Sequence, residues 1–256
     1  MNLKIQHSNR IGNFLIQIKN SIHIALYYNY NVILPVHTLL NTTYIVINKD
    51  VTLDNKIIID KYNFYYRDKI KNINKSLFTI NADKVLIILK DIFKIKNISP
   101  LKNDELVIHI RSGDIFTSKP HPGYIIPPLS YYKNIIEQKK YKNIYLLAED
   151  RLNPCIDQLI KLYPTIIFKL QSLEEDIKII LAARNIVISY GTFITSILIH
   201  SDNTENVYVP SYLNYNNHED TIPDCTMHVT DLEKYHKMML PWKNTVEQRE
   251  KMLTYQ

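Results

Sequence analysis

The chain has 256 residues, of which 46% are hydrophobic and 22% charged, and its formal net charge is +6. These proportions are ordinary for a globular protein, and they exclude collagen, a coiled coil, low-complexity disorder and a disulfide-bonded scaffold. Lysines are interspersed with acidic residues, which favours a solvated basic surface over a nucleic-acid-binding one. The two cysteines, Cys155 and Cys225, lack metal-binding spacing, so free thiols in a reducing compartment are expected.

The sequence also bears on membranes and targeting. The N-terminal residues contain no apolar signal core, and the most apolar long stretch, 14–34, is interrupted by polar side chains such as Lys19 and His23. A stretch of this kind is too polar to span a bilayer. We therefore expect a cytoplasmic protein without a transmembrane segment and without a nucleic-acid partner.

The first third of the chain predicts a strand, a helix and a second strand. Residues 2–6 alternate as a short strand does, and residues 14–26 place apolar side chains on one face of a helix. Residues 32–35 are typical of a buried strand that ends at a proline. Together these elements predict a βαβ crossover. A strand over 56–60 and a helix over 82–95 complete this part of the chain.

From residue 105 onward, strands and helices alternate regularly. Strands are predicted over 105–110, 143–149, 165–170, 185–190 and 206–210, the last strand of the chain, and helices up to about 139 and over 153–162, 172–183 and 192–201. Ser172 and Glu175 have the spacing of a capping box at a helix start. This alternation indicates a parallel sheet covered by helices on both faces.

The fold class that follows is α/β, with two Rossmann-like domains whose parallel sheets face a cleft. The boundary is expected in the linker 97–103, which contains a Ser-Pro pair. The N-terminal domain then covers 1–98 and the C-terminal domain 103–230. Residues 231–256 are expected to form helices that could pack back on the first domain.

Glycine is scarce, with four residues where average usage of about 7% would give roughly 18. Gly12, Gly113 and Gly191 each lie at or near the carboxyl end of a predicted strand, the edge where open α/β sheets bind ligands. Gly12 and Gly191 also precede or open predicted helices, whose starts favour phosphate groups. The alternative is a tight turn without a ligand. Gly123 indicates a turn in a loop between Asp114 and the next helix.

The predicted strand 105–110 carries His109 and is followed directly by Arg111. An arginine at the mouth of a buried strand needs an anionic partner, and a diphosphate suits a guanidinium because it binds in a bidentate manner. The alternative is a structural ion pair between Arg111 and Asp114, with His109 as a hydrogen-bonded core residue. The residues alone leave both interpretations open.

These residues resemble a known family. His109-x-Arg111-x-Gly113-Asp114 resembles the H-x-R-x-G-D signature of GDP-fucose-dependent fucosyltransferases, which comprise the α1,2 and α1,6 enzymes and the protein O-fucosyltransferases. The segment 10–13, Arg-Ile-Gly-Asn, resembles their N-terminal G-x-x-G-N loop. Asp176, followed by Ser189 to Phe193, resembles their third motif. The three motifs occur in the family's order.

The resemblance implies a GT-B-type fold and a metal-independent, inverting transfer of fucose from GDP-fucose to a glycan hydroxyl. It assigns the acceptor side to the first domain, the nucleotide-sugar to the second, and no metal or other cofactor to the site. It implies catalytic roles for Arg111, on the β-phosphate, and for Asn13, which would reach across from the first domain. An inverting reaction also needs a base, and Asp114 is the first choice because it is close to Arg111. The nucleotide-sugar-binding residues that the resemblance implies are Gly12, Asn13, His109, Arg111, Asp176, Ser189, Gly191, Thr192 and Phe193.

Several features leave the donor and the base open. Ser112 stands where the family usually has a second arginine. Two alternatives therefore stay open: the same fold with another nucleotide-sugar, and a non-catalytic module that binds a nucleotide or a glycan. No Asp-x-Asp sequence occurs, which disfavours a metal-dependent site. Candidate bases besides Asp114 are His121, Glu149 and Asp150. The Pro- and Tyr-rich loop 120–132 could stack a sugar ring, although a structural role is favoured for it.

Overall fold

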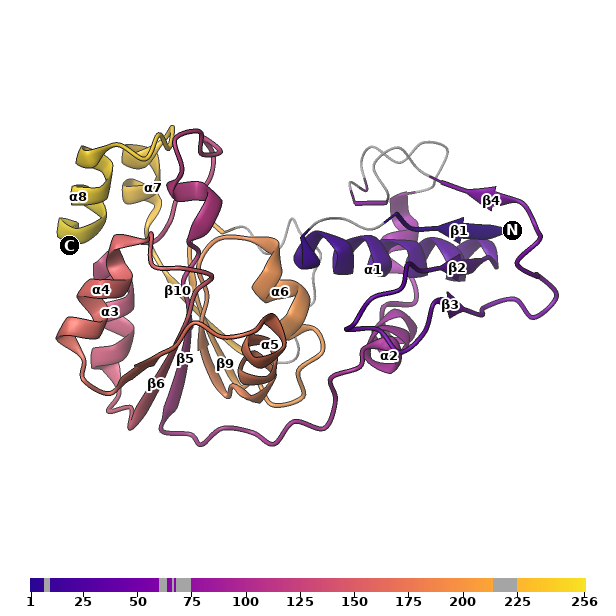
Figure 1. The fold of residues 1–256 in the computed structure, drawn as a ribbon, viewed down its shortest axis with the longest axis horizontal. Helices are drawn as coiled ribbons and strands as arrows, with labels where there is room; N and C mark the ends of the chain where they lie inside the picture. The colour runs from indigo at the N-terminus through magenta and orange to yellow at the C-terminus, as the bar shows by residue number, and fades with distance from the viewer. Residues whose placement is uncertain (7–9, 60–63, 66, 68–74, 214–224) are drawn as a thin grey trace. The chain divides into compact units, whose positions relative to one another are not determined.

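The computed structural model describes residues 1–6, 10–59, 64–65, 67, 75–213 and 225–256. The chain divides into two compact units, Met1–Asn97 and Ile98–Gln256 (Figure 1). The division falls at the start of the predicted linker 97–103. Each unit has its own sheet and its own helices, so each is described by itself.

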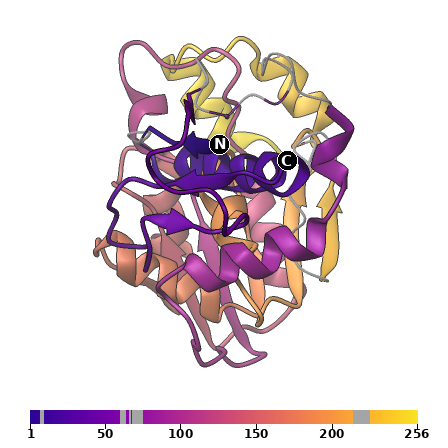
Figure 2. The same cartoon turned by 90° about the vertical axis from the view of Figure 1, so that its right-hand side faces the viewer.

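The first unit contains a small mixed sheet in the order β3-β2-β1-β4. Its elements are β1 (Asn2–Lys4), α1 (Ile11–Tyr28), β2 (Asn31–Ile33), β3 (Tyr44–Ile45), β4 (Ile57–Ile58), the 3-10 helix η2 (Lys75–Thr79) and α2 (Ala82–Ile92). β1 pairs in parallel with β2 and with β4, which confirms the predicted βαβ crossover. α2 packs against α1 (Figure 2).

The expectation of a wholly parallel sheet is wrong for this unit, because β3 runs antiparallel to β2. Only the segment 34–43 connects these two strands. A parallel return needs a crossover of about a dozen residues or more, usually through a helix, so a connection this short brings the chain back antiparallel. The sequence pattern of residues 43–80 was too weak to predict this strand.

The second unit contains a six-stranded sheet in the order β10-β9-β8-β5-β6-β7, and every pair of neighbours is parallel. Its strands are β5 (Glu105–His109), β6 (Asn143–Leu147), β7 (Ile166–Phe168), β8 (Asn185–Val187), β9 (Asn206–Pro210) and β10 (Thr226–Thr230). Its helices are the 3-10 helix η3 (Gly113–Phe116), α3 (Leu129–Gln138), α4 (Pro154–Leu162), α5 (Leu173–Ala182), α6 (Thr192–Leu198), α7 (Glu233–Met239) and α8 (Val246–Thr254).

This order identifies the second unit as a doubly wound, Rossmann-like α/β unit. When the strands are counted from β5, the sheet reads 3-2-1-4-5-6 from the β7 edge, which is the Rossmann strand order. The order reverses between β5 and β8, so the loops after these two strands diverge to opposite faces. Figure 1 shows α3 and α4 on one face of the sheet and α5 and α6 on the other.

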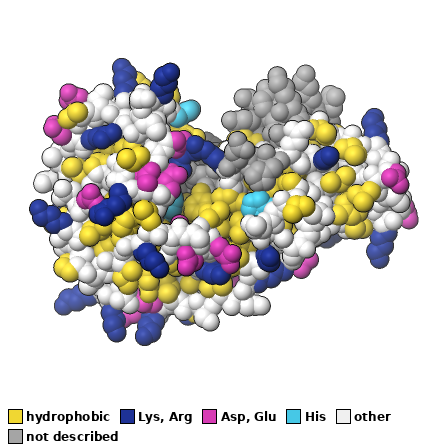
Figure 3. Space-filling model, in the orientation of Figure 1, with side chains coloured by type: hydrophobic (Ala, Val, Ile, Leu, Met, Phe, Trp, Pro, Cys, Tyr) yellow, Lys and Arg dark blue, Asp and Glu magenta, His cyan; other side chains and the backbone are white. Residues whose placement is uncertain are grey.

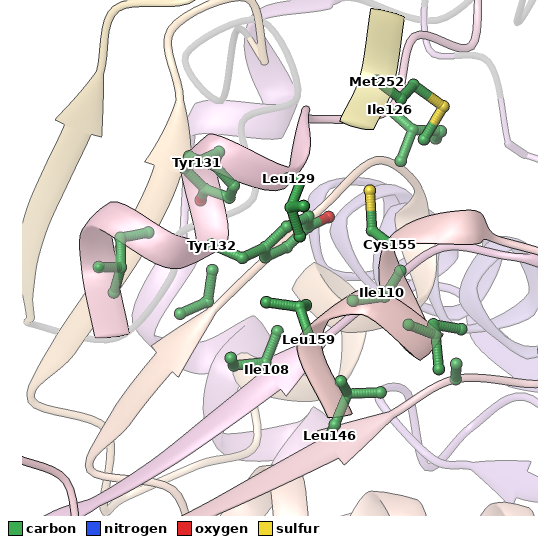
Figure 4. Close-up of a cluster of buried hydrophobic side chains, with 14 of the residues drawn as sticks. Ile108, Ile110, Ile126, Leu129, Tyr131, Tyr132, Leu146, Cys155, Leu159 and Met252 are labelled. Carbon is green, nitrogen blue, oxygen red and sulfur yellow. The ribbon is translucent and has the colours of Figure 1, made fainter. Parts of the chain in front are cut away.

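One large apolar core lies between the sheet and the α3–α4 face. Side chains from β5, β6, α3, α4 and α8 converge there, as Figure 4 shows for Ile108, Leu146, Tyr132, Leu159 and Met252. All five are nearly or completely inaccessible to solvent. The core therefore supports β5, the strand that leads directly to Arg111.

The C-terminal segment contains a strand that the sequence did not predict. β10 follows β9 as a further strand, but its side chains are largely exposed, so it lacks the apolar pattern that predicts a strand. The helices of residues 231–256 belong to the second unit. α8 packs against α3 and α4, because Met252 and the nearby Trp242 are apolar and complete the core of that unit.

Candidate functional site

The candidate site lies where the carboxyl ends of β5 and β8 meet. The two strands are paired neighbours, with Ile108 opposite Val187. Arg111 follows β5, Ser189 follows β8, and the Arg111 backbone N–H donates a hydrogen bond to Ser189 Oγ at 2.8 Å. The motifs that resemble the second and third family motifs are thus in direct contact at the point where nucleotides bind in doubly wound sheets.

Ser189 and Gly191 position Arg111 in different ways. Ser189 is fully buried, and its hydroxyl accepts the hydrogen bond of the Arg111 backbone N–H. Its predicted contact with a nucleotide-sugar stays a prediction. Gly191 has a φ of +125°, a conformation that side-chain-bearing residues rarely adopt, and a Cβ there would lie 3.9 Å from Arg111 Cδ. Gly191 thereby allows the sharp turn into α6 directly beside Arg111.

The Arg111 guanidinium is held by two carboxylates. Nη2 pairs with Asp114, and Nη1 lies 3.4 Å from Glu149 Oε1. The Arg111 side chain is 17% exposed, against 43% for Asp114 and 53% for Glu149. The ion pair that the sequence left open is therefore present. An anionic ligand at Arg111 would have to compete with two carboxylates, both of which reach solvent.

The Ser112 side chain faces the interior. The second arginine that the family usually has at this position would have to face the ligand in order to bind a phosphate group. Ser112 is fully buried, and its hydroxyl donates a hydrogen bond to Asp150. The backbone N–H of Asn153 donates to Ser112 Oγ at 3.0 Å, and Asn153 Nδ2 donates to the Arg111 carbonyl at 3.0 Å. Asp150 therefore belongs to the support of the loop.

Sequence reasoning did not identify Asn153 as part of this support. Asn153 caps the N-terminus of α4, accepting a hydrogen bond from the Cys155 N–H at 2.9 Å. An asparagine directly before Pro154 is a recognisable helix start, so the cap itself was detectable. Its second contact, with Arg111, depends on the packing of β5 beside β6 and has no local sequence signal.

Gly113 allows the loop to pass close to Glu149. Its φ is +70°, and a Cβ at this position would lie 2.1 Å from Glu149 Oε1. A side chain at residue 113 would thus displace the carboxylate that pairs with Arg111. The glycine of the predicted motif is explained by this close approach.

His109 is a neutral, buried member of the site. Burial, together with the adjacent Arg111 cation, lowers the pKa of His109 from 6.5 to about 3. Its ring centroid lies 5.6 Å from that of Phe193, at the start of α6. Within the described residues His109 Nδ1 has no hydrogen-bond partner, so the alternative of a hydrogen-bonded core histidine is not met at this atom.

The other predicted residues are spread over three helix starts. Thr192 and Phe193 open α6, next to Gly191. Asp176 lies in the first turn of α5, where Gln171 Nε2 donates to its carboxylate at 2.8 Å and burial raises its pKa. Gly12 and Asn13 lie in the first turn of α1, in the first unit. The reach of Asn13 to a diphosphate stays a prediction.

In the described part of the chain, we looked for a charged patch, a metal-binding group and a membrane-spanning helix. On the face in Figure 3, basic side chains lie among acidic and hydrophobic ones. The described residues include no group of three or more His, Cys, Asp or Glu side chains that could hold a metal ion. They also include no helix with both the length and the apolar character needed to cross a membrane.

Gly113→Ala should destabilise the second unit. A left-handed backbone costs a side-chain-bearing residue about 1–2 kcal/mol, and the added Cβ also displaces Glu149. Urea denaturation should therefore give a free energy of unfolding lower by at least that amount. Gly123→Ala is the matched control, because Gly123 has no positive φ and its added Cβ would lie 3.4 Å from His121 Cε1. An equal effect of both substitutions would contradict the close approach at Gly113.

The stability of the protein should depend on pH through His109. Between pH 6.5 and about 3 the unfolded state binds a proton on this imidazole that the folded state does not bind. The free energy of unfolding should therefore fall as the pH decreases through this window, by up to about 1.4 kcal/mol per pH unit from His109. Above pH 6.5 the group is neutral in both states and contributes nothing.

Urea denaturation at a series of pH values tests this expectation. His109→Gln should reduce the slope between about pH 6.5 and 5, where the unfolded His109 takes up its proton. His228→Gln is the control, since His228 is exposed on β10. Equal slopes for the unmodified protein and His109→Gln would show that His109 is not held neutral by burial.

Comparisons of the chain with models of known protein families, with curated proteins and with solved structures return no match. The function is therefore inferred from the residues and the geometry of the chain itself.

Proposed function

We propose that the second unit binds a nucleoside diphosphate sugar at the carboxyl edge of its sheet, beside Arg111. The observation that carries this proposal is the hydrogen bond between the Arg111 N–H and Ser189 Oγ, at the point where the strand order reverses. A guanidinium there suits a diphosphate, which it binds in a bidentate manner. The fucosyltransferase-like motifs make GDP-fucose the first donor to test.

The proposed reaction is the transfer of the sugar to a glycan hydroxyl by direct displacement. The acceptor oxygen attacks the anomeric carbon and forms the new glycosidic bond, while the bond from that carbon to the β-phosphate oxygen breaks. The leaving diphosphate keeps the electron pair, and Arg111 stabilises the charge that develops on it. Attack from the side opposite the leaving group inverts the anomeric configuration. Arg111 supplies the cation, so this route does not depend on a metal.

The acceptor proton passes to a carboxylate, and Asp114 is the first candidate. In the free protein Asp114 and Glu149 both pair with Arg111. A bound diphosphate would take over the guanidinium and release at least one of these carboxylates, since both are partly exposed. The released group then loses the stabilisation that Arg111 gives its charged form and becomes a better proton acceptor. Donor binding would thus activate the base.

The two-domain, GT-B-type arrangement belongs to the same proposal. In it, Asn13 at the start of α1 contacts the diphosphate or the acceptor, and Thr192, Phe193 and Asp176 bind the nucleotide from the α5–α6 side. His109, which is buried and neutral, supports Phe193 from below through the contact between their rings. The first unit would then contribute the acceptor side.

GDP should stabilise the unmodified protein against heat, and Arg111→Ala should reduce this stabilisation to about half or less. At about 100 times its Kd, a ligand adds about 2.7 kcal/mol to the free energy of unfolding. Losing the charged contact should weaken binding about 10- to 100-fold. A thermal-shift series with GDP, UDP, dTDP and their sugars measures this.

Arg151→Ala is the matched control for that series. Arg151 follows β6 at the same sheet edge, and its own ion pair with Asp157 is exposed. Its replacement should leave nucleotide binding unchanged. The absence of a shift with every nucleotide at millimolar concentration would refute the donor site.

Asp114→Asn should separate donor binding from turnover. Removing a carboxylate that competes for Arg111 should leave GDP affinity equal or higher, whereas sugar transfer to a glycan acceptor should fall about 10²- to 10⁴-fold because the base is lost. Binding is measured by calorimetry and transfer by product analysis. Asp157→Asn is the control, as it removes the partner of Arg151 and should change neither quantity. Turnover within a few-fold of normal in Asp114→Asn would exclude Asp114 as the base.

A further inference from the structure

A row of three aromatic rings extends from the Arg111 loop to the surface of the second unit. The ring centroids of Tyr190 and Tyr124 are 4.7 Å apart, and those of Tyr124 and His121 are 4.4 Å apart. The outer end of the row is the most exposed. Tyr190 and Tyr124 are partly buried and pack against the core, whereas His121 is exposed.

The inner end of the row, Tyr190, lies in the chain between two residues that approach Arg111. Ser189 accepts the hydrogen bond of the Arg111 N–H, and Gly191 approaches Arg111 Cδ closely enough that a Cβ would touch it. Tyr190 lies between these two residues in the chain. Tyr124 and His121 come from the loop between η3 and α3, more than 60 positions earlier in the sequence. The row is therefore made by the fold and continues the proposed donor site outward.

The C-terminal segment holds this loop in place. The Trp242 backbone N–H donates to the Pro122 carbonyl at 2.8 Å, and the Tyr212 hydroxyl donates to the Ile125 carbonyl at 3.2 Å. Asn244 Nδ2 donates to the Thr117 carbonyl at 3.0 Å. These bonds use backbone carbonyls of the loop and none of the three rings. A loop fixed in this way presents its rings without a large ordering cost on binding.

The outermost ring is also oriented. The Gly123 N–H donates to His121 Nδ1 at 3.2 Å, so this nitrogen is an acceptor and the other ring nitrogen is left for a ligand or water. A Cβ at Gly123 would lie 3.4 Å from His121 Cε1, in ordinary contact. His121 therefore combines an apolar ring face with a polar edge.

We infer that this row, Tyr190, Tyr124 and His121, binds the glycan acceptor as a neutral oligosaccharide. One face of a pyranose ring presents C–H groups that pack on an aromatic ring, while its hydroxyl groups stay in contact with solvent. A row that runs from the reacting centre to solvent suits a chain of sugar units that continues beyond the site. The inference rests on the proposed function, which assigns the nucleotide to the α5–α6 side. It makes the loop before α3 the second unit's own part in acceptor binding, alongside the part proposed for the first unit.

Binding of neutral oligosaccharides, followed by saturation-transfer NMR and calorimetry, tests this inference. The probes are N-acetyllactosamine, chitotriose, cellotriose and mannotriose, each at about 10 mM, where a Kd of about 1 mM gives near saturation. Tyr124→Leu keeps apolar volume against the core but removes the ring, and should weaken binding of the preferred sugar about tenfold. His121→Ala, at an exposed position, should weaken it about threefold. GDP affinity should be unchanged in both variants.

His228→Ala is the matched control. His228 stacks on Tyr208 at a centroid distance of 4.6 Å, but this pair lies on β10 and β9, away from the loops that carry the row. Its replacement should leave sugar binding unchanged. Circular dichroism and urea denaturation check that each variant is folded. If Tyr124→Leu does not fold, His121→Ala alone decides the test.

The outcomes separate this inference from the proposed function. Sugar binding that is weakened in the row variants supports the inference, whether or not a nucleotide binds. The absence of nucleotide binding would refute the donor site and leave the sugar site standing. Absence of binding by all four sugars overturns the inference. Sugar binding that is unchanged in both row variants overturns it as well. Loss of GDP binding with retained sugar binding would show that the row stacks a nucleobase instead, and would also overturn it.

Discussion

The parallel pairing of β5 with β8 is the constraint on which the candidate site depends. Val107 lies opposite Ile186 and Ile108 opposite Val187, all four of them buried, and this register brings two loops that are 78 residues apart into hydrogen-bond contact. The helices that follow these strands lie on opposite faces, so the loops diverge and leave Arg111 at their junction. Without this pairing the residues of the two motifs would not lie together.

The ion pairs of Arg111 suit an exchange of its partners better than they suit stabilisation of the fold. Its partners Asp114 and Glu149 are each about half exposed, and ion pairs of this kind typically contribute about 0–1 kcal/mol to folding. The core of β5, β6, α3, α4 and α8 stabilises the unit without them. In the proposed site, the guanidinium would exchange a carboxylate for a phosphate group at little cost to the fold. The fully buried Ser112 and Ser189 would keep the loop backbone in place during that exchange.

The scarce glycines are concentrated where the backbone requires them. Gly113 and Gly191 both have positive φ, and both would bring a Cβ toward the Arg111–Glu149 pair or the Arg111 side chain. Gly123 lies beside His121, in the loop that carries two of the three aromatic rings. Three of the four glycines thus lie in loops of this one region, and the fourth, Gly12, lies in α1 of the first unit. The proposed donor and acceptor sites share this region, which links their chemistry to one set of loops.

The sequence by itself determined the local elements of this protein. The alternation of strands and helices, the capping box of Ser172 and Glu175, and the position of Arg111 just after a buried strand follow from periodicity and from helix-start chemistry. These signals lie within a few residues of one another, so they can be read without the fold. They also led to the correct α/β class and to a single candidate edge of the sheet.

Only the tertiary structure decided which residues meet. The contacts of Arg111 with Ser189 and Glu149, the inward orientation of Ser112, the exposed edge strand β10 and the packing of α8 on α3 and α4 have no local pattern. Each depends on the order of strands in the sheet and on which face a helix covers. These are properties of long-range packing, because pairing between distant strands is chosen by burial of the whole core and not by the spacing of residues along one segment.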